Sequence, residues 1–138
     1  QVRILKERSQ QEPLEQVEPV MCREELLTAI AKVRQVHVDD QIYDYIARLA
    51  EVTRTHPLLK LGISPRGALA LCRTAKARAF AEGRDFVVPE DVTQMAEYVF
   101  AHRLMLSSKA RLNEYTPEAI VAEVLAQTQP PVLSERRA

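Results

Sequence analysis

The middle of the chain reads Leu61-Gly62-Ile63-Ser64-Pro65-Arg66-Gly67-Ala68-Leu69-Ala70-Leu71-Cys72. This stretch predicts where a long helix begins, because Ser64 is a residue type that caps helix N-termini with its side-chain oxygen. Pro65 follows at the first helical position, where its missing N–H costs nothing. The helical pattern continues to about Glu82, and Gly83 is a typical residue just past a helix end.

Arg66 is unusual at this place. A cation in the first helical turn faces the positive end of the helix dipole, which is unfavourable by roughly 0.3–1 kcal/mol at an exposed site. The arrangement becomes favourable when an anion lies there, since helix N-termini bind phosphate and arginine adds a planar fork of donors. The position of Arg66 therefore indicates an anion-binding function for the start of this helix.

Composition indicates one helical domain with no overall attraction to nucleic acid. The chain has 138 residues, equal numbers (19 each) of basic and acidic residues, and only 3 glycines. A zero net charge means that nucleic-acid binding would need a local basic patch, which argues against it. Few glycines among many Ala, Leu, Glu and Arg residues favour helices over sheet.

Cysteine usage and hydropathy indicate a reduced, cytoplasmic protein without a membrane partner. The two cysteines, Cys22 and Cys72, show no CxxC spacing, and the sequence has no signal-like or membrane-length apolar run. Cys72 stands among apolar residues at helical spacing, so we expect a buried structural thiol there.

The chain begins in a helix-like pattern without an initiator methionine, which predicts that it is cut from a longer polypeptide. We expect residues 1–21 to be the end of a preceding helix and a linker, because Pro13 and Pro19 interrupt them. Residues 22–127 form the predicted domain, and residues 128–138 a flexible tail.

Apolar periodicity predicts a mainly α fold, a small helical bundle with one or two short strands. The expected helices span residues 24–36, 40 to about 56, 65 to about 82 and 118 to about 127, and a further helix opens at Pro89 with an apolar stripe that reaches Val99. Short extended pieces are expected at 36–38, 84–88 and 102–106. Residues 58–61 and 107–113 are expected to be loops.

A self-contained catalytic site is missing from the sequence. There is no GxxxxGK[ST], GxGxxG or GxSxG motif, and His37, His56 and His102 lack metal-ligand spacing. The acidic pairs at 39–40 and 90–91 precede predicted helices, where capping explains them. A free-standing enzyme is therefore not expected.

Four motifs in a fixed order carry a family resemblance. They are Gly62–Leu71, then Ala75-Lys76-Ala77, then Gly83-Arg84-Asp85-Phe86-Val87-Val88-Pro89-Glu90-Asp91-Val92, then His102-Arg103. This series resembles the C-terminal lid of MoxR-type AAA+ ATPases, whose pattern runs G-x-S-P-R-A, A-K-A, G-R-D-[YF]-V-x-P-x-D-V and H-R. The resemblance covers about residues 24–126 and implies a helical bundle of the AAA+ lid type.

The resemblance implies specific roles. Arg66 would be the sensor-2 arginine that reaches the γ-phosphate of ATP, with Ser64 and Pro65 positioning it. The parent protein would bind ATP and Mg, hydrolyse ATP as a homo-oligomeric ring, expected to be a hexamer, and remodel or mature client proteins. Its expected partners are the ATPase core of the same chain and von Willebrand factor A-domain proteins. Without a P-loop, the present chain should be inactive and hold no cofactor by itself.

Two positions depart from the family pattern. Gly67 stands where alanine is common, which should loosen the first helical turn by roughly 0.5–1 kcal/mol. Val88 stands where a capping threonine is common, which should remove a cap worth about 1 kcal/mol. Both changes leave Arg66 in place.

Three alternatives stay open on the sequence. Arg66 could be a solvated arginine paired with a neighbouring acid. A basic strip of Arg73, Lys76, Arg78 and Arg84 could serve a helical adaptor or nucleic-acid-binding module. The chain could also be the lid of another AAA+ branch, of the chelatase or helicase type.

Overall fold

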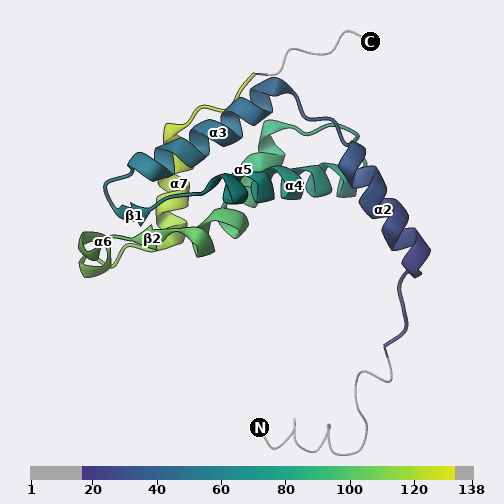
Figure 1. Ribbon diagram of the computed structural model, residues 1–138, viewed down its shortest axis with the longest axis horizontal. Coiled ribbons are helices and arrows are strands. Elements are labelled where there is room, and N and C mark those ends of the chain that lie inside the picture. The colour runs from purple at the N-terminus through teal and green to yellow at the C-terminus, as the bar shows by residue number, and fades with distance from the viewer. Residues whose placement is uncertain (1–16, 133–138) are drawn as a thin grey trace, which may run out of the picture. The chain divides into compact units, whose positions relative to one another are not determined.

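A computed structural model describes residues 17–132 of the chain (Figure 1). By its internal contacts the chain divides into two units, Gln1–Ala31 and Lys32–Ala138. In the described part of the first unit, the regular structure is helix α2 (Arg23–Gln35). The last four residues of α2 belong to the second unit. It begins at a reciprocal cap, in which the Cys22 N–H donates to Glu25 Oε2 at 2.7 Å and the Glu25 N–H donates to Cys22 Sγ at 3.4 Å.

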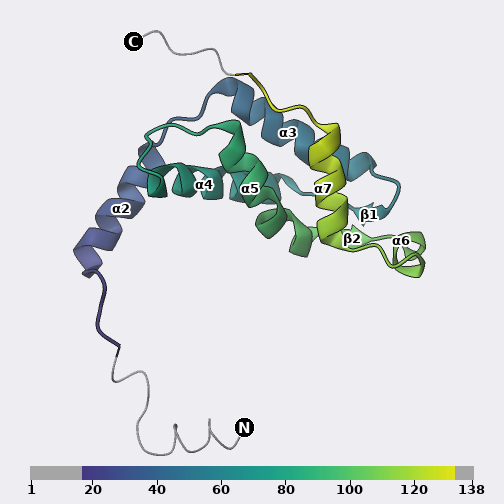
Figure 2. The same ribbon diagram turned by 180° about the vertical axis from the view of Figure 1, so that it is seen from behind.

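The second unit is a bundle of helices with a very small sheet at one end (Figures 1 and 2). Its elements are α3 (Asp40–Thr55), β1 (Leu59–Leu61), α4 (Pro65–Ala81), α5 (Pro89–Phe100), the 3₁₀ turn η2 (Ala101–Arg103), β2 (Met105–Leu106), α6 (Ser108–Leu112) and α7 (Pro117–Gln127). Side-chain oxygens cap most of these helices, since Asp39, Ser64, Ser107 and Thr116 each accept a hydrogen bond from a first-turn N–H.

The core lies where α4 packs against α5 and α3, with α7 packing against α5 and α3 in turn. Its largest completely buried apolar side chains are Tyr45, Phe100, Ile42, Leu49, Ile63, Leu71, Ile120, Val87, Val92, Val121 and Val124. Helix α4 buries mainly small side chains, including Ala75 and Ala79, which permits a close approach of its neighbours. Figure 2 shows α5 and α7 from the side where they are nearest the viewer.

The sheet joins two segments that are far apart in sequence. Strands β1 and β2 pair antiparallel, with Leu59 opposite Leu106 and Leu61 opposite Met105. Because β1 precedes α4 and β2 follows η2, this pairing ties η2 to the region where α4 begins. An isolated parallel bridge between His37 and Phe86 makes a second, shorter extended contact.

The structure confirms the mainly α bundle with short strands, and it corrects three local predictions. Residues 58–61, expected to be a loop, contain β1, because β2 supplies backbone partners from the far end of α5. Residues 107–113, also expected to be a loop, contain the short helix α6, which Ser107 caps. Residues 102–106 are extended only at β2, because the turn η2 continues α5. The predicted segment 1–21 and tail 128–138 lie partly outside the described residues.

The end of α3 fixes the loop that leads into α4. Thr53 Oγ1 accepts a hydrogen bond from the Ile63 N–H at 2.8 Å, and Arg54 Nε donates to the Ile63 carbonyl at 2.8 Å. Gly62, the residue before Ile63, lies very close to α3. A Cβ added at Gly62 would be 2.5 Å from the Thr53 carbonyl carbon. Only glycine fits this close backbone approach, so α4 starts at a fixed place.

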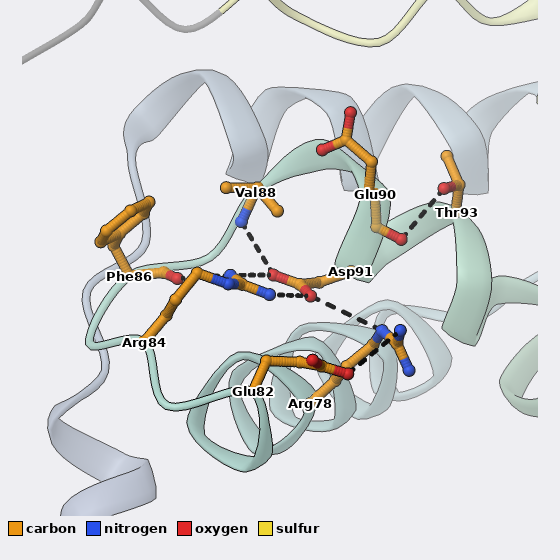
Figure 3. A network of polar contacts seen from close by, with 8 residues as sticks. All are labelled: Arg78, Glu82, Arg84, Phe86, Val88, Glu90, Asp91 and Thr93. Carbon is orange, nitrogen blue, oxygen red and sulfur yellow. Dashed lines mark hydrogen bonds and ion pairs between the residues drawn. The ribbon is translucent and has the colours of Figure 1, made fainter.

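The other end of α4 is fixed by a buried carboxylate (Figure 3). Asp91 is 1% exposed and accepts two hydrogen bonds from Arg84, at 2.7 and 2.6 Å. Its Oδ2 also accepts from the Val88 N–H at 2.9 Å, and Arg78 Nε lies 3.6 Å from its Oδ1. Asp91 thus supplies one half of a capping box where Val88 cannot, and joins the end of α4 to the start of α5. The hydrogen bonds to Asp91 raise the pKa of Arg84.

Replacing Gly62 with alanine should destabilise the fold by about 2–3 kcal/mol, because the new Cβ would press on the backbone of α3. Gly83→Ala is the matched control: Gly83 has φ of 76° but nothing within 4 Å of an added Cβ, so only backbone strain of about 1 kcal/mol is expected. Urea unfolding of both variants tests this. A larger loss for Gly83→Ala would contradict the close-approach explanation.

Replacing Asp91 with alanine should destabilise the fold by about 2–4 kcal/mol, because it leaves two partly buried guanidinium groups without a carboxylate. Asp91→Asn should lose less, since an amide oxygen can still accept from the Val88 N–H. The exposed Asp85→Asn is the control and should stay within about 0.5 kcal/mol. Equal unfolding midpoints for Asp91→Ala and Asp85→Asn would refute the structural role of Asp91.

Candidate functional site

Arg66 lies at the second position of α4, with its side chain exposed. Its guanidinium makes no hydrogen bond or ion pair with any of residues 17–132. The alternative in which Arg66 pairs with a neighbouring acid is therefore not seen within this range. A cation at the positive end of a helix without a compensating carboxylate is a group that an external anion would stabilise.

The cap of α4 leaves one backbone donor near Arg66. Ser64 Oγ accepts from the Gly67 N–H at 3.3 Å, and the Ala68 N–H bonds the Ser64 carbonyl at 3.1 Å. Pro65 has no N–H, so the first-turn donor without a partner in the described part of the chain is the N–H of Arg66. The predicted cap at Ser64 and the proline at the first helical position are both confirmed.

A cavity of about 570 Å³ opens beside this helix start. Its polar walls contain three arginines, Arg66, Arg73 and Arg103, and no carboxylate. The other lining residues are Leu61, Gly62, Ser64, Gly67, Leu69 and Ala70. A cleft lined by one sign of charge concentrates the opposite charge from solution, so this cavity favours an anion.

Arg103 comes to the cavity from η2, through the end of α5. Its Nη1 donates to the Val99 carbonyl at 2.5 Å and contacts His102 Nε2. The sequence identified His102-Arg103 as a motif but assigned no role to Arg103, because only the fold brings η2 beside α4. The sequence signal that could have pointed to Arg103 was the match of His102-Arg103 to the last motif of the family series.

Gly67 has a different role from the one expected. The sequence predicted only a looser first turn, whereas the structure shows a buried glycine in close contact with two side chains. A Cβ at Gly67 would lie 2.8 Å from Ile63 Cγ2 and 3.4 Å from Arg103 Cδ. The glycine therefore makes room for the side chain of Ile63 and for the stem of Arg103.

The predicted basic strip is not a continuous cationic surface. Arg78 and Arg84 both form ion pairs with Asp91. Lys76 Nζ donates to the Arg34 carbonyl at 2.5 Å. Arg73 is the member of the strip that lines the arginine-lined cavity. Two of the four cations are thus neutralised by a carboxylate, which argues against the nucleic-acid alternative.

The remaining candidate groups do not assemble into a second site. Within the described ranges no group of three His, Cys, Asp or Glu side chains is placed to hold a metal ion. Cys72 is half-buried rather than fully buried, and burial raises the pKa of its thiol. Among the same residues, no helix has the length and apolar character needed to cross a membrane.

Comparison with known proteins gives the family. The AAA lid domain family matches residues 51–124. Protein YeaC of Bacillus subtilis is 38% identical over 120 residues, which are 87% of this chain and 38% of that protein. Chaperone MoxR1 of Mycobacterium tuberculosis is 33% identical over 97 residues, 64% of this chain and 26% of MoxR1. Protein MoxR of Methylorubrum extorquens is 42% identical over 67 residues, 47% of this chain and 20% of that protein.

A solved structure supports the same fold. The crystal structure of a Cytophaga hutchinsonii protein superimposes with a TM-score of 0.81 at 24% identity, covering 95% of this chain and 42% of that one. The chain spans less than two fifths of the length of each of these curated relatives. The family match, the MoxR relatives and the shared fold together show that the chain belongs to the AAA lid domain family, as a lid of the MoxR-type AAA+ ATPases.

Proposed function

We propose that this lid couples ATP binding and hydrolysis to the remodelling or maturation of client proteins, and that Arg66 acts as its sensor-2 arginine. The observation that carries the proposal is the placement of Arg66: exposed, without a partner among residues 17–132, and at the mouth of a cavity without acids. A planar guanidinium at a helix N-terminus suits a terminal phosphate group, which it can bind through two parallel hydrogen bonds.

The chemistry of the site fits one part of a nucleotide pocket. ATP supplies the phosphoryl group, and Mg supplies charge neutralisation of the phosphates. The cavity offers donors for phosphate oxygens, while the described residues offer no cluster of ligands for the metal. The P-loop and the metal ligands would therefore come from the ATPase core, and this lid would contribute the cation that meets the terminal phosphate.

Arg66 would act in two ways. It would stabilise the negative charge on the phosphoryl group during transfer, and it would make the orientation of the lid depend on whether that group is present. The rigid start of α4 matters for both, because the loop before Arg66 is held by Thr53 and Arg54. A fixed helix start converts the loss of the terminal phosphate into a movement of the whole lid rather than of one side chain.

The wider setting follows from the family and is part of the proposal. The lid would dock on the ATPase core of its own chain within a homo-oligomeric ring, expected to be a cytoplasmic hexamer. Von Willebrand factor A-domain proteins are the proposed clients. The relative MoxR1 is named as a chaperone, which supports a client-remodelling role.

In the intact ATPase that contains this lid, Arg66→Ala should lower kcat for ATP hydrolysis by about 100-fold, because one charge-stabilising contact to the transferred group is lost. The unfolding free energy should change by less than about 0.5 kcal/mol, since the side chain is exposed. Steady-state phosphate release and thermal unfolding measure the two effects.

Arg111→Ala is the control, since it removes an exposed arginine from α6 whose guanidinium donates to the Leu106 carbonyl. It should leave hydrolysis within about twofold of the unchanged protein. The sensor role is wrong if Arg66→Ala hydrolyses ATP normally, or if its hydrolysis and stability fall in parallel. Hydrolysis by the 138-residue chain alone would also contradict the proposal.

A further inference from the structure

We propose that Arg103 is a second phosphate-binding residue, so that the arginine-lined cavity binds an extended polyphosphate chain rather than one phosphate group. The inference deepens the proposed function and rests on the anion-binding role given there to Arg66. It adds a residue from a different element, η2, and it specifies the ligand class by charge and length.

The charge of the cavity is uncompensated. Arg66, Arg73 and Arg103 line it, and none of the three forms an ion pair with a carboxylate in residues 17–132. At the other end of α4, the half-buried Arg78 and Arg84 have an acidic partner in Asp91. Three guanidinium groups around one cavity repel each other, and an anion between them would remove that repulsion.

Arg103 is held in place by its own neighbours. Within the described residues, the guanidinium contacts the Val99 carbonyl and His102, both through Nη1. Nε and Nη2 therefore keep their donors available among the described residues. Its stem passes close to Gly67, where even a methyl group would touch it. A cation fixed through one nitrogen loses less side-chain entropy on binding a ligand than a cation that moves freely.

The number of arginines favours a highly charged anion. Arg66 and Arg73 are seven residues apart on one helix, and thus about 10 Å apart along its axis, while Arg103 comes from η2. A chain of phosphates can offer a separate phosphate group to each of the three guanidinium groups that line the cavity. The volume of about 570 Å³ lies within the roughly 300–1,000 Å³ of ordinary ligand pockets.

The test is an NMR titration of the 138-residue chain with inorganic tripolyphosphate at low ionic strength, with orthophosphate as the comparison anion. Tripolyphosphate should bind more tightly than orthophosphate and shift the amide signals of Arg66 and Gly67. Arg103→Gln should weaken tripolyphosphate binding about tenfold, because a charged hydrogen-bond donor is lost. Arg111→Gln, outside the cavity, should bind as the unchanged chain does.

Arg103→Lys separates the phosphate contact from packing. Lysine keeps the stem beside Gly67 and the charge but lacks the planar fork, so it should restore part of the affinity lost in Arg103→Gln. If Arg103→Gln is poorly folded by circular dichroism, the lysine variant alone decides: affinity equal to that of the unchanged chain overturns the inference, and a several-fold loss supports it.

Tripolyphosphate binding by the Arg103→Gln and Arg66→Gln variants separates the roles of the two arginines. Normal binding by Arg103→Gln with weak binding by Arg66→Gln overturns the inference and leaves the role of Arg66 standing. Weak binding by Arg103→Gln with normal binding by Arg66→Gln supports the inference and counts against the sensor-2 proposal. Equal weakening by Arg111→Gln, or no binding by the unchanged chain, overturns it, because the cavity would then have no special affinity.

Discussion

The attachment of Ile63 to the end of α3 is the constraint on which the rest of the bundle depends. Two hydrogen bonds hold the backbone of Ile63 on both sides. Its N–H donates to Thr53, and its carbonyl accepts from Arg54. Gly62 allows the backbones to come close enough for these bonds to form. Because Ile63 is also 1% exposed, the same residue anchors the loop by packing and by hydrogen bonding. Helix α4 therefore has little freedom in where it starts.

Helix α4 is held at both ends by different physical means. At its start the restraint is backbone contact with α3, and at its end it is the buried carboxylate of Asp91 with Arg84 and Arg78 (Figure 3). Between them the small buried side chains let α3 and α5 approach closely. Contacts at both ends and along its length therefore restrain α4 against shifting independently of α3 and α5.

The helices could be predicted from the sequence because their caps are adjacent residues. The strand pairing and part of the candidate site could not, because they depend on contacts between residues far apart in the sequence. Ser64-Pro65 and Thr116-Pro117 each combine a cap with a proline at the first helical position, so both helix starts follow from adjacent residues. Strand β1 forms by pairing with β2, in which Leu106 lies opposite Leu59. Nothing in residues 58–61 indicates that this distant segment is their partner. The candidate anion site could be predicted at Arg66, because the signals for the start of its helix are local in sequence. The presence of Arg103 could not be predicted, because it requires the path of α5 and η2.

The zero net charge of the chain conceals a separation of charge along α4. Near the end of the helix, the cations Arg78 and Arg84 are neutralised by Asp91, with Glu82 close to Arg78. Arg66 in the first turn and Arg73 in the middle of the helix have no acidic partner within the described chain, and the helix dipole adds further positive potential at Arg66. This unpaired charge contributes nothing to the stability of the isolated bundle and slightly opposes it. An anion supplied from outside the bundle, as proposed for Arg66, would turn the repulsion among these guanidinium groups into attraction.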